Sequence, residues 1–147
     1  MTRKWKVSLL AVYGLVMVWL LFGQRMGKDN EPMLQMTLFA TLERFWRVLM
    51  VSTDPDLRRQ AWINLAGNVV MFVPMGFFFP WIWNCWRKIY LHFLLMAGII
   101  LSVEVTQILT RLGTCDVDDL LLNLVGTGLG FLAWYLLFRK EPQKTES

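Results

Sequence analysis

The sequence predicts an all-α integral membrane protein with four transmembrane helices. Hydrophobic residues make up 56% of the 147 residues, and charged residues only 18%. Soluble domains carry about 25% charged residues, and the mean hydropathy of this chain is +0.44. Four apolar segments also follow one another along the chain, separated by polar stretches. This composition excludes a disordered chain and a disulfide-stapled secreted domain, and it argues against a water-soluble enzyme.

The four segments have lengths typical of membrane spans. A spanning helix needs about 20 mostly apolar residues, so the last three segments fit and the first is short. Three basic residues precede the first segment, as in a signal peptide, but no small-residue cleavage site follows, so we expect an uncleaved anchor. We interpret residues 1–147 as a single membrane domain. The predicted spans are residues 7–22, 65–83, 89–109 and 120–138.

The distribution of Lys and Arg predicts that both termini are cytoplasmic. With an inside N-terminus, the inner pieces 1–6, 84–89 and 139–147 carry eight basic residues in 21 positions. The outer pieces 23–64 and 110–119 carry seven in 52. The protein is therefore expected to be a multi-pass protein of the cell membrane, with the lipid bilayer as its first partner.

The basic balance of the chain does not indicate a nucleic-acid partner. The pI is about 9.3, but the basic residues flank apolar segments and do not form one patch. The same topology places Cys85 at the inner surface and Cys115 at the outer one. A disulfide needs Cα atoms within about 7 Å, so an internal bridge is excluded by this topology.

The long outer loop contains a predicted amphipathic helix over Leu38–Met50. Its apolar residues recur at helical spacing, with Glu43, Arg44 and Arg47 on the opposite arc. Such a helix suits the outer membrane surface, and a small soluble cap over the bundle is an equally good interpretation. Asp54-Pro55-Asp56 then marks a turn or a helix start.

Polar side chains collect at the outer ends of the last three predicted spans, at a similar shallow depth. Polar groups inside hydrocarbon are costly, and a lone acid such as Glu104 suggests a functional site. The inner ends show only Ser8, Asn84 and His92, and we expect His92 at the membrane interface. We therefore predict a polar binding site that opens outward. Its members are Asn64 and Asn68 on the second span, Glu104, Gln107 and Arg111 on the third, and Asp116, Asp119 and Asn123 on the fourth.

Each of these residues also has a structural interpretation. The acids Asp116, Asp118 and Asp119 could cap the fourth span and offset its dipole. The asparagines could simply hydrogen-bond between helices, and Arg111 could anchor at the interface or pair with Glu104. Small residues are expected to allow close helix packing, with Pro74 loosening the second span. These packing positions are Gly67, Gly76, Gly126 and Gly130.

Two ordered motifs resemble the VanZ-like family of bacterial membrane proteins. Residues 64–80 read NLAGNVVMFVPMGFFFP, and residues 102–130 read SVEVTQILTRLGTCDVDDLLLNLVGTGLG. The resemblance implies a helical membrane protein related to one associated with resistance to the glycopeptide teicoplanin. Many members carry an arginine three residues before the first Asp of the second motif, where this chain has Gly113.

Three functions compete for this sequence. The favoured one is a non-enzymatic cell-envelope factor linked to glycopeptide resistance, whose outward site binds a headgroup, a cell-wall precursor or the drug, with no metal or cofactor. The alternative is a membrane enzyme acting on a lipid-linked envelope substrate, with Glu104 as base and the acids at 116–119 holding Mg²⁺ or Ca²⁺. A proton- or ion-coupled transporter is disfavoured because the inner half lacks polar groups. The sequence leaves the oligomeric state open.

Overall fold

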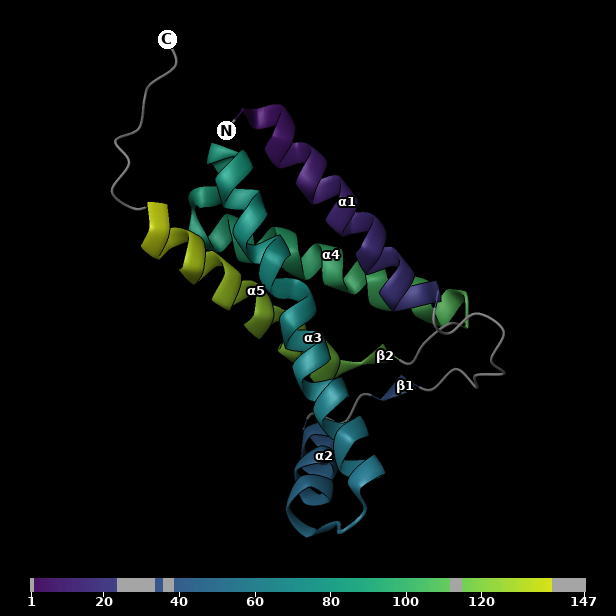
Figure 1. The fold of residues 1–147 in the computed structure, drawn as a ribbon. Coiled ribbons are helices and arrows are strands. Elements are labelled where there is room, and N and C mark those ends of the chain that lie inside the picture. Colours follow the sequence, from purple (N-terminus) through teal and green to yellow (C-terminus); the bar gives the residue numbers. More distant parts are fainter. Residues whose placement is uncertain (1, 24–33, 36–38, 112–114, 139–147) are drawn as a thin grey trace.

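The computed structural model of the chain describes residues 2–23, 34–35, 39–111 and 115–138 (Figure 1). Within these ranges it contains five α-helices, a short 3₁₀ helix and one pair of two-residue strands. The helices are α1 (Arg3–Phe22), α2 (Ala40–Val51), α3 (Pro55–Ile82), α4 (Ile89–Leu109) and α5 (Val117–Phe138), with the 3₁₀ helix η2 at Asn84–Arg87. Strand β1 (Leu34–Gln35) pairs in parallel with β2 (Cys115–Asp116).

Four of these helices, α1, α3, α4 and α5, are long and apolar enough to cross a membrane. The prediction of four apolar spans is therefore confirmed. The bounds of α4 coincide with the predicted residues 89–109, and α1 and α5 begin at Arg3 and Val117, a few residues before the predicted starts at 7 and 120. Large apolar side chains such as Leu15, Leu94 and Leu136 point outward and are exposed, as expected for residues that face lipid.

Helix α3 begins at Pro55, well before the predicted start at residue 65, because its first turn is capped. The Asp54 carboxylate accepts from the backbone N–H of Asp56 at 2.9 Å, and Pro55 occupies the first helical position. At 1.5 Å per residue, the 28 residues of α3 extend about 42 Å, more than the roughly 30 Å of a hydrocarbon core. The first turns of α3 therefore project beyond the other three long helices.

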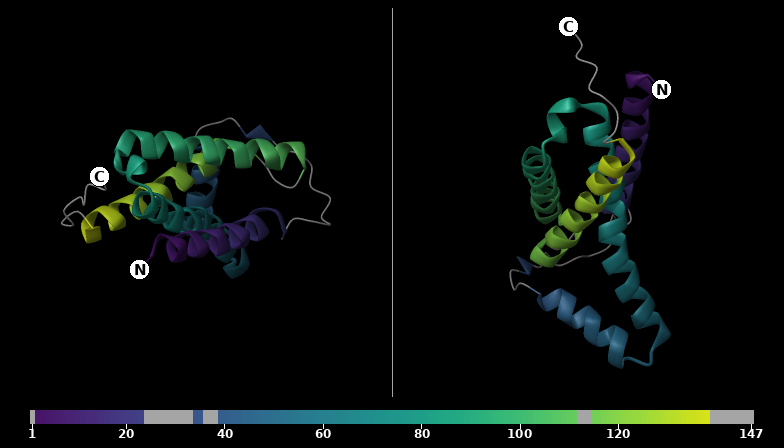
Figure 2. Two further views of the ribbon diagram at one scale, coloured as in Figure 1. Left: turned by 90° about the horizontal axis from the view of Figure 1, so that it is seen from above. Right: turned by 90° about the vertical axis from the view of Figure 1, so that its left-hand side faces the viewer.

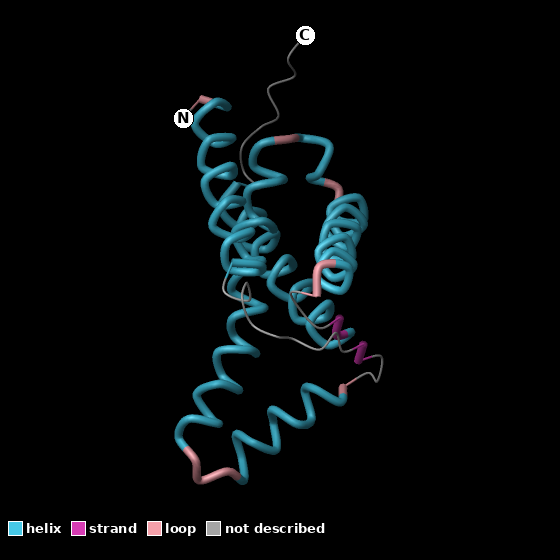
Figure 3. Tube along the Cα trace, turned by 90° about the vertical axis from the view of Figure 1, so that its right-hand side faces the viewer, coloured by secondary structure: helices cyan, strands magenta, loops and turns pink. Residues whose placement is uncertain are grey.

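Helix α2 packs beside these projecting turns, beyond the end of the main bundle (Figures 2 and 3). It buries Leu49 and leaves Trp46 and Met50 exposed. Glu43 and Arg47 form a salt bridge along its exposed side, at 2.6 Å. Helix α2 thus lies where the sequence predicted a helix, over Leu38–Met50. Its position on the outer membrane surface stays a prediction.

The closest helix packing in the protein joins α3 to α5. A Cβ added at Gly126 would lie 2.0 Å from the Val69 carbonyl oxygen, and one at Gly130 would lie 1.9 Å from that of Val73. These distances leave no room for any side chain. Because both residue numbers rise together along the contact, α3 and α5 run in the same direction. We call this contact the α3–α5 seam.

The glycines of α3 differ in role. A Cβ at Gly76 would lie 2.1 Å from the Thr127 carbonyl oxygen, so Gly76 belongs to the seam. A Cβ at Gly67 would meet nothing within 4 Å, so the expected close packing at this glycine is wrong. Pro74 lies inside a continuous helix, and the Tyr13 hydroxyl of α1 donates to the nearby Met71 carbonyl.

The start of α1 and the end of α5 both lie at the end of the bundle away from α2 (Figure 1). The end of α3, helix η2 and the start of α4 lie there too, since Lys6 donates to the Trp81 carbonyl at 3.3 Å and Arg87 to that of Pro80 at 3.2 Å. We call this the basic end. The opposite end, where α4 finishes and α5 begins, carries Glu104 and the Asp118-Asp119 pair, and we call it the acidic end. The predicted topology assigns the basic end to the cytoplasm.

Candidate functional site

The acidic end brings α3 and α5 together through polar side chains as well as through the seam. The amide of Asn68 on α3 donates to the Asp119 carboxylate on α5 at 2.5 Å. Both side chains are partly buried, so this hydrogen bond lies at the edge of the bundle and not in its centre. The two residues were predicted as members of one cluster, and the structure places them in contact.

Two further predicted members face the interior of the bundle and not lipid. Glu104 on α4 is 4% exposed, and Asn123 on α5 is also 4% exposed. The Asn123 Oδ1 atom has no hydrogen-bond donor among the described residues. An unsatisfied buried acceptor costs about 1–3 kcal/mol, so this oxygen calls for a donor from elsewhere.

Gln107 is buried too, but it serves a different contact. Its side-chain amide donates to the Leu21 carbonyl at 3.3 Å, so it ties the end of α1 to the end of α4. Asn64 and Arg111 are exposed, and Arg111 adopts a left-handed φ of 56° just after α4 ends. Asp116 lies in strand β2, and its side chain falls outside the described residues.

Asp118 has a role that its local sequence does not suggest. It is fully buried, and its carboxylate accepts three backbone N–H groups at the start of α2. These come from Phe39 at 2.7 Å, Thr41 at 2.9 Å and Leu42 at 3.1 Å. Helix α2 has no side-chain cap of its own and begins at Phe39 with a left-handed φ of 63°. Asp118 therefore caps α2, whereas the sequence suggested a cap for the helix that carries Asp118.

The acids at the start of α5 show no metal-ligand arrangement in the described part of the chain. No three His, Cys, Asp or Glu side chains gather there in a group that could hold a metal ion. Both Asp118 oxygens already accept backbone hydrogen bonds from α2.

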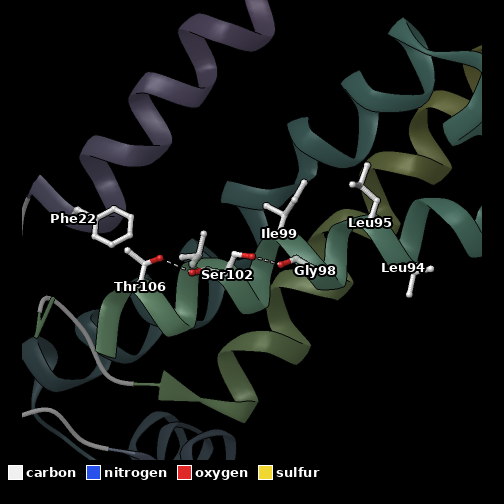
Figure 4. Close-up of a pocket in the computed structure, with 8 residues that line it drawn as sticks. Phe22, Leu94, Leu95, Gly98, Ile99, Ser102 and Thr106 are labelled. Atoms are coloured by element: carbon white, nitrogen blue, oxygen red, sulfur yellow. Dashed lines mark hydrogen bonds between the residues drawn. The ribbon is translucent and has the colours of Figure 1, made fainter. Parts of the chain in front are cut away.

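A hollow of about 640 Å³ lies between the end of α1 and α4, and no acidic side chain lines it (Figure 4). The Ser102 and Thr106 hydroxyls on its wall both donate to carbonyls one turn earlier in α4, each at 2.7 Å. Those hydroxyls are thus already used within the helix, and the remaining wall is apolar. The hollow suits an acyl chain better than a polar ligand. Its lining is Phe22, Leu94, Leu95, Gly98, Ile99, Ser102, Val103 and Thr106.

The half of the bundle near the basic end holds more buried polar atoms than the sequence suggested. His92 is fully buried, with its ring 4.8 Å from that of Phe131, so it packs inside the bundle, while its expected place at the depth of the membrane interface stays a prediction. Neither ring nitrogen of His92 has a hydrogen-bond partner among the described residues, and the same holds for the Thr127 hydroxyl and the Trp134 N–H. The argument that the inner half lacks polar groups therefore fails.

The fold and its buried polar side chains together define a class, a helical membrane protein with four apolar spans. Comparison with protein families then identifies the chain within that class. The family model described as VanZ/LLP1 matches residues 8–139, nearly the whole chain, so the protein belongs to the VanZ/LLP1 family. This confirms the resemblance seen in the two motifs. Comparison with curated proteins gives no match, and comparison with solved structures gives none either.

Proposed function

We propose that this protein is a non-enzymatic factor of the bacterial cell envelope, linked to glycopeptide resistance. In this proposal it crosses the cell membrane four times with both termini inside, and its acidic end faces outward. That end binds a lipid headgroup, a cell-wall precursor or a glycopeptide such as teicoplanin. Glycopeptides act outside the membrane, so an outward site lies on the correct side.

The buried oxygen of Asn123 is the observation that carries this proposal. It lacks a donor within the described chain, and on α5 it lies one helical turn from Asp119, which holds Asn68. Glu104 adds a carboxylate turned toward the interior of the bundle. Groups of this kind accept hydrogen bonds, so the matching ligand presents hydroxyl, amide N–H or ammonium donors. Cell-wall precursors and glycopeptides both carry such donors.

A membrane enzyme acting on a lipid-linked envelope substrate is the second candidate. The observation that favours it is the burial of Glu104 within an apolar helix, an environment typical of a general base. Turnover of a lipid-linked precursor by the purified protein, lost in Glu104→Gln, would support the enzyme over the binding factor.

Drug susceptibility tests the binding function directly. A strain lacking the gene is complemented with the wild type, with Glu104→Gln or with Asn123→Ala, at matched expression. Glu43→Gln is the matched control, because Glu43 is an exposed acid on α2 whose carboxylate pairs with Arg47. We expect the wild type and the control to raise the teicoplanin concentration needed to stop growth, and the other two variants to fail. Full resistance in both would remove the named residues from the function.

The orientation is tested by labelling intact cells with a membrane-impermeant thiol reagent. Cys85 is an exposed free cysteine within η2, at the basic end. In a Cys115→Ser variant, which keeps Cys85 as the single cysteine, we expect no labelling until the cells are opened. Labelling of Cys85 in intact cells would reverse the topology and place the acidic end in the cytoplasm.

A further inference from the structure

The basic end contains a pocket that the acidic end and its function do not use. It has a volume of about 380 Å³, and its lining comes from three separate elements, α1, α3 and η2, with Trp83 between the last two. Most of its surface is polar, unlike the hollow between α1 and α4. We call it the basic pocket. It is lined by Arg3, Lys6, Trp81, Ile82, Trp83, Asn84, Cys85 and Arg87.

Three cations converge on this pocket, and its lining contains no carboxylate. None of these three cations takes part in the salt bridge found in the described part of the chain, which joins Arg47 to Glu43 on α2. Two of the cations are fixed by the fold. Lys6 donates to the Trp81 carbonyl, and its ammonium lies 4.3 Å from the centre of the Trp81 ring. The Arg87 guanidinium lies 5.5 Å from the centre of the Trp134 ring.

The fixed positions matter because an exposed lysine or arginine ordinarily keeps its charge in bulk water. Here hydrogen bonds to backbone carbonyls and contacts with indole faces hold the charged groups of Lys6 and Arg87, and Arg3 lines the same pocket. Three like charges held together repel one another unless an anion lies between them. The tryptophans place the pocket at the depth of the headgroups, where aromatic residues favour the membrane interface. An anion of the membrane surface is therefore the matching ligand.

Arg87 also lines a second, apolar cavity, and this separates a lipid from a free anion. That cavity has a volume of about 490 Å³ and lies between α4 and α5, with Phe93, Gly128 and Phe131 on its walls. A ligand whose charge meets Arg87 in the basic pocket could lay a hydrocarbon chain in this second cavity. Inorganic phosphate has no such chain.

We propose that the basic end binds one anionic phospholipid, with its phosphate among Arg3, Lys6 and Arg87 and an acyl chain in the cavity between α4 and α5. The inner leaflet supplies such lipids, and basic pockets between helices on the cytoplasmic side bind anionic headgroups. The site lies at the opposite end of the bundle from the acidic side chains, so it is independent of the proposed resistance function.

The test uses Cys85, because its exposed thiol lines the basic pocket. The full-length Cys115→Ser protein is placed in nanodiscs of phosphatidylcholine, with or without phosphatidylglycerol of the same acyl chains, and the rate of Cys85 alkylation is measured. We expect phosphatidylglycerol to slow alkylation and inorganic phosphate to have no such effect. Equal protection by inorganic phosphate would overturn the lipid assignment, and equal rates with both lipids would overturn the site.

Neighbouring basic residues provide matched controls for general surface charge. Lys6→Gln and Arg87→Gln remove cations from the pocket, whereas Lys4→Gln and Lys88→Gln remove exposed cations beside them that do not line it. Each pocket substitution should lower the apparent affinity for phosphatidylglycerol about fivefold, given the usual contribution of one basic residue at a membrane surface. The controls should change it by less. Equal losses in all four variants would show general surface attraction and refute the pocket.

Native mass spectrometry gives a second readout that does not depend on Cys85. A single retained phosphatidylglycerol on the wild type, lost in Lys6→Gln and Arg87→Gln but kept in the controls, would support the proposal. Circular dichroism of every variant separates loss of lipid from loss of fold. A wild type that retains no phosphatidylglycerol, or retains both lipids equally, would contradict the proposal.

Discussion

The two ends of the bundle use charge in opposite ways. At the acidic end, Asp118 and Asp119 accept hydrogen bonds from α2 and from Asn68, so their charge joins elements of the fold. At the basic end, Arg3, Lys6 and Arg87 surround a pocket with no carboxylate in its lining. Asp118 and Asp119 are thus partners in contacts between elements of the fold, whereas no carboxylate in the lining of the basic pocket neutralises its cations. The difference shows that charge density alone does not identify which end binds something.

The α3–α5 seam holds both ends in register, so breaking it gives the largest expected effect. Gly126→Ala places a Cβ 2.0 Å from the Val69 carbonyl oxygen, and the helices must separate to accept it. We expect a loss of about 3 kcal/mol in the free energy of unfolding, the upper range for overpacking. Gly67→Ala is the control, because its Cβ meets open space. Thermal unfolding in detergent compares the two, and equal melting temperatures would disprove the seam.

Removal of the Asp118 cap on α2 gives the second-largest expected loss of stability, and it tests the contrast between the two ends. Asp118→Ala leaves three N–H groups at the start of α2 without their acceptor, so we expect a loss of about 2 kcal/mol. Hydrogen exchange at Phe39, Thr41 and Leu42 should accelerate. The control at the basic end is Arg3→Gln, an exposed residue for which we expect little change. A larger loss for Arg3→Gln would invert the comparison.

The hydrogen bond between Asn68 and Asp119 gives the smallest effect. Interhelical polar contacts in membrane proteins contribute about 0.6 kcal/mol on average. We expect a double-mutant cycle of Asn68→Ala and Asp119→Ala to return a coupling energy of this order. Unfolding of the two single variants and the double variant measures it. Strictly additive losses would mean that the two side chains act independently, and Asp119 would then be as available to a ligand as the cations of the basic pocket.

The spans could be predicted from the sequence because hydrocarbon demands long apolar runs, and α4 begins and ends where the pattern indicates. Asn68 and Asp119 could be assigned to one cluster from their depth, although depth does not say which side chain meets which. Gly67 and Gly126 look alike along the chain, and their difference depends on which face of each helix meets a neighbour. Asp118 was beyond local reasoning, since its partners on α2 precede it by 76 to 79 residues.

The same separation orders the assembly of the molecule. The ribosome synthesises α2 well before Asp118, because Asp118 belongs to α5, the last helix of the described chain. The backbone N–H groups at the start of α2 therefore wait for their acceptor. Until α5 arrives, the first turn of α2 depends on water for its hydrogen bonds. The acidic end is therefore completed only when α5 has been added, so a chain that stops before α5 lacks both the α3–α5 seam and the cap of α2.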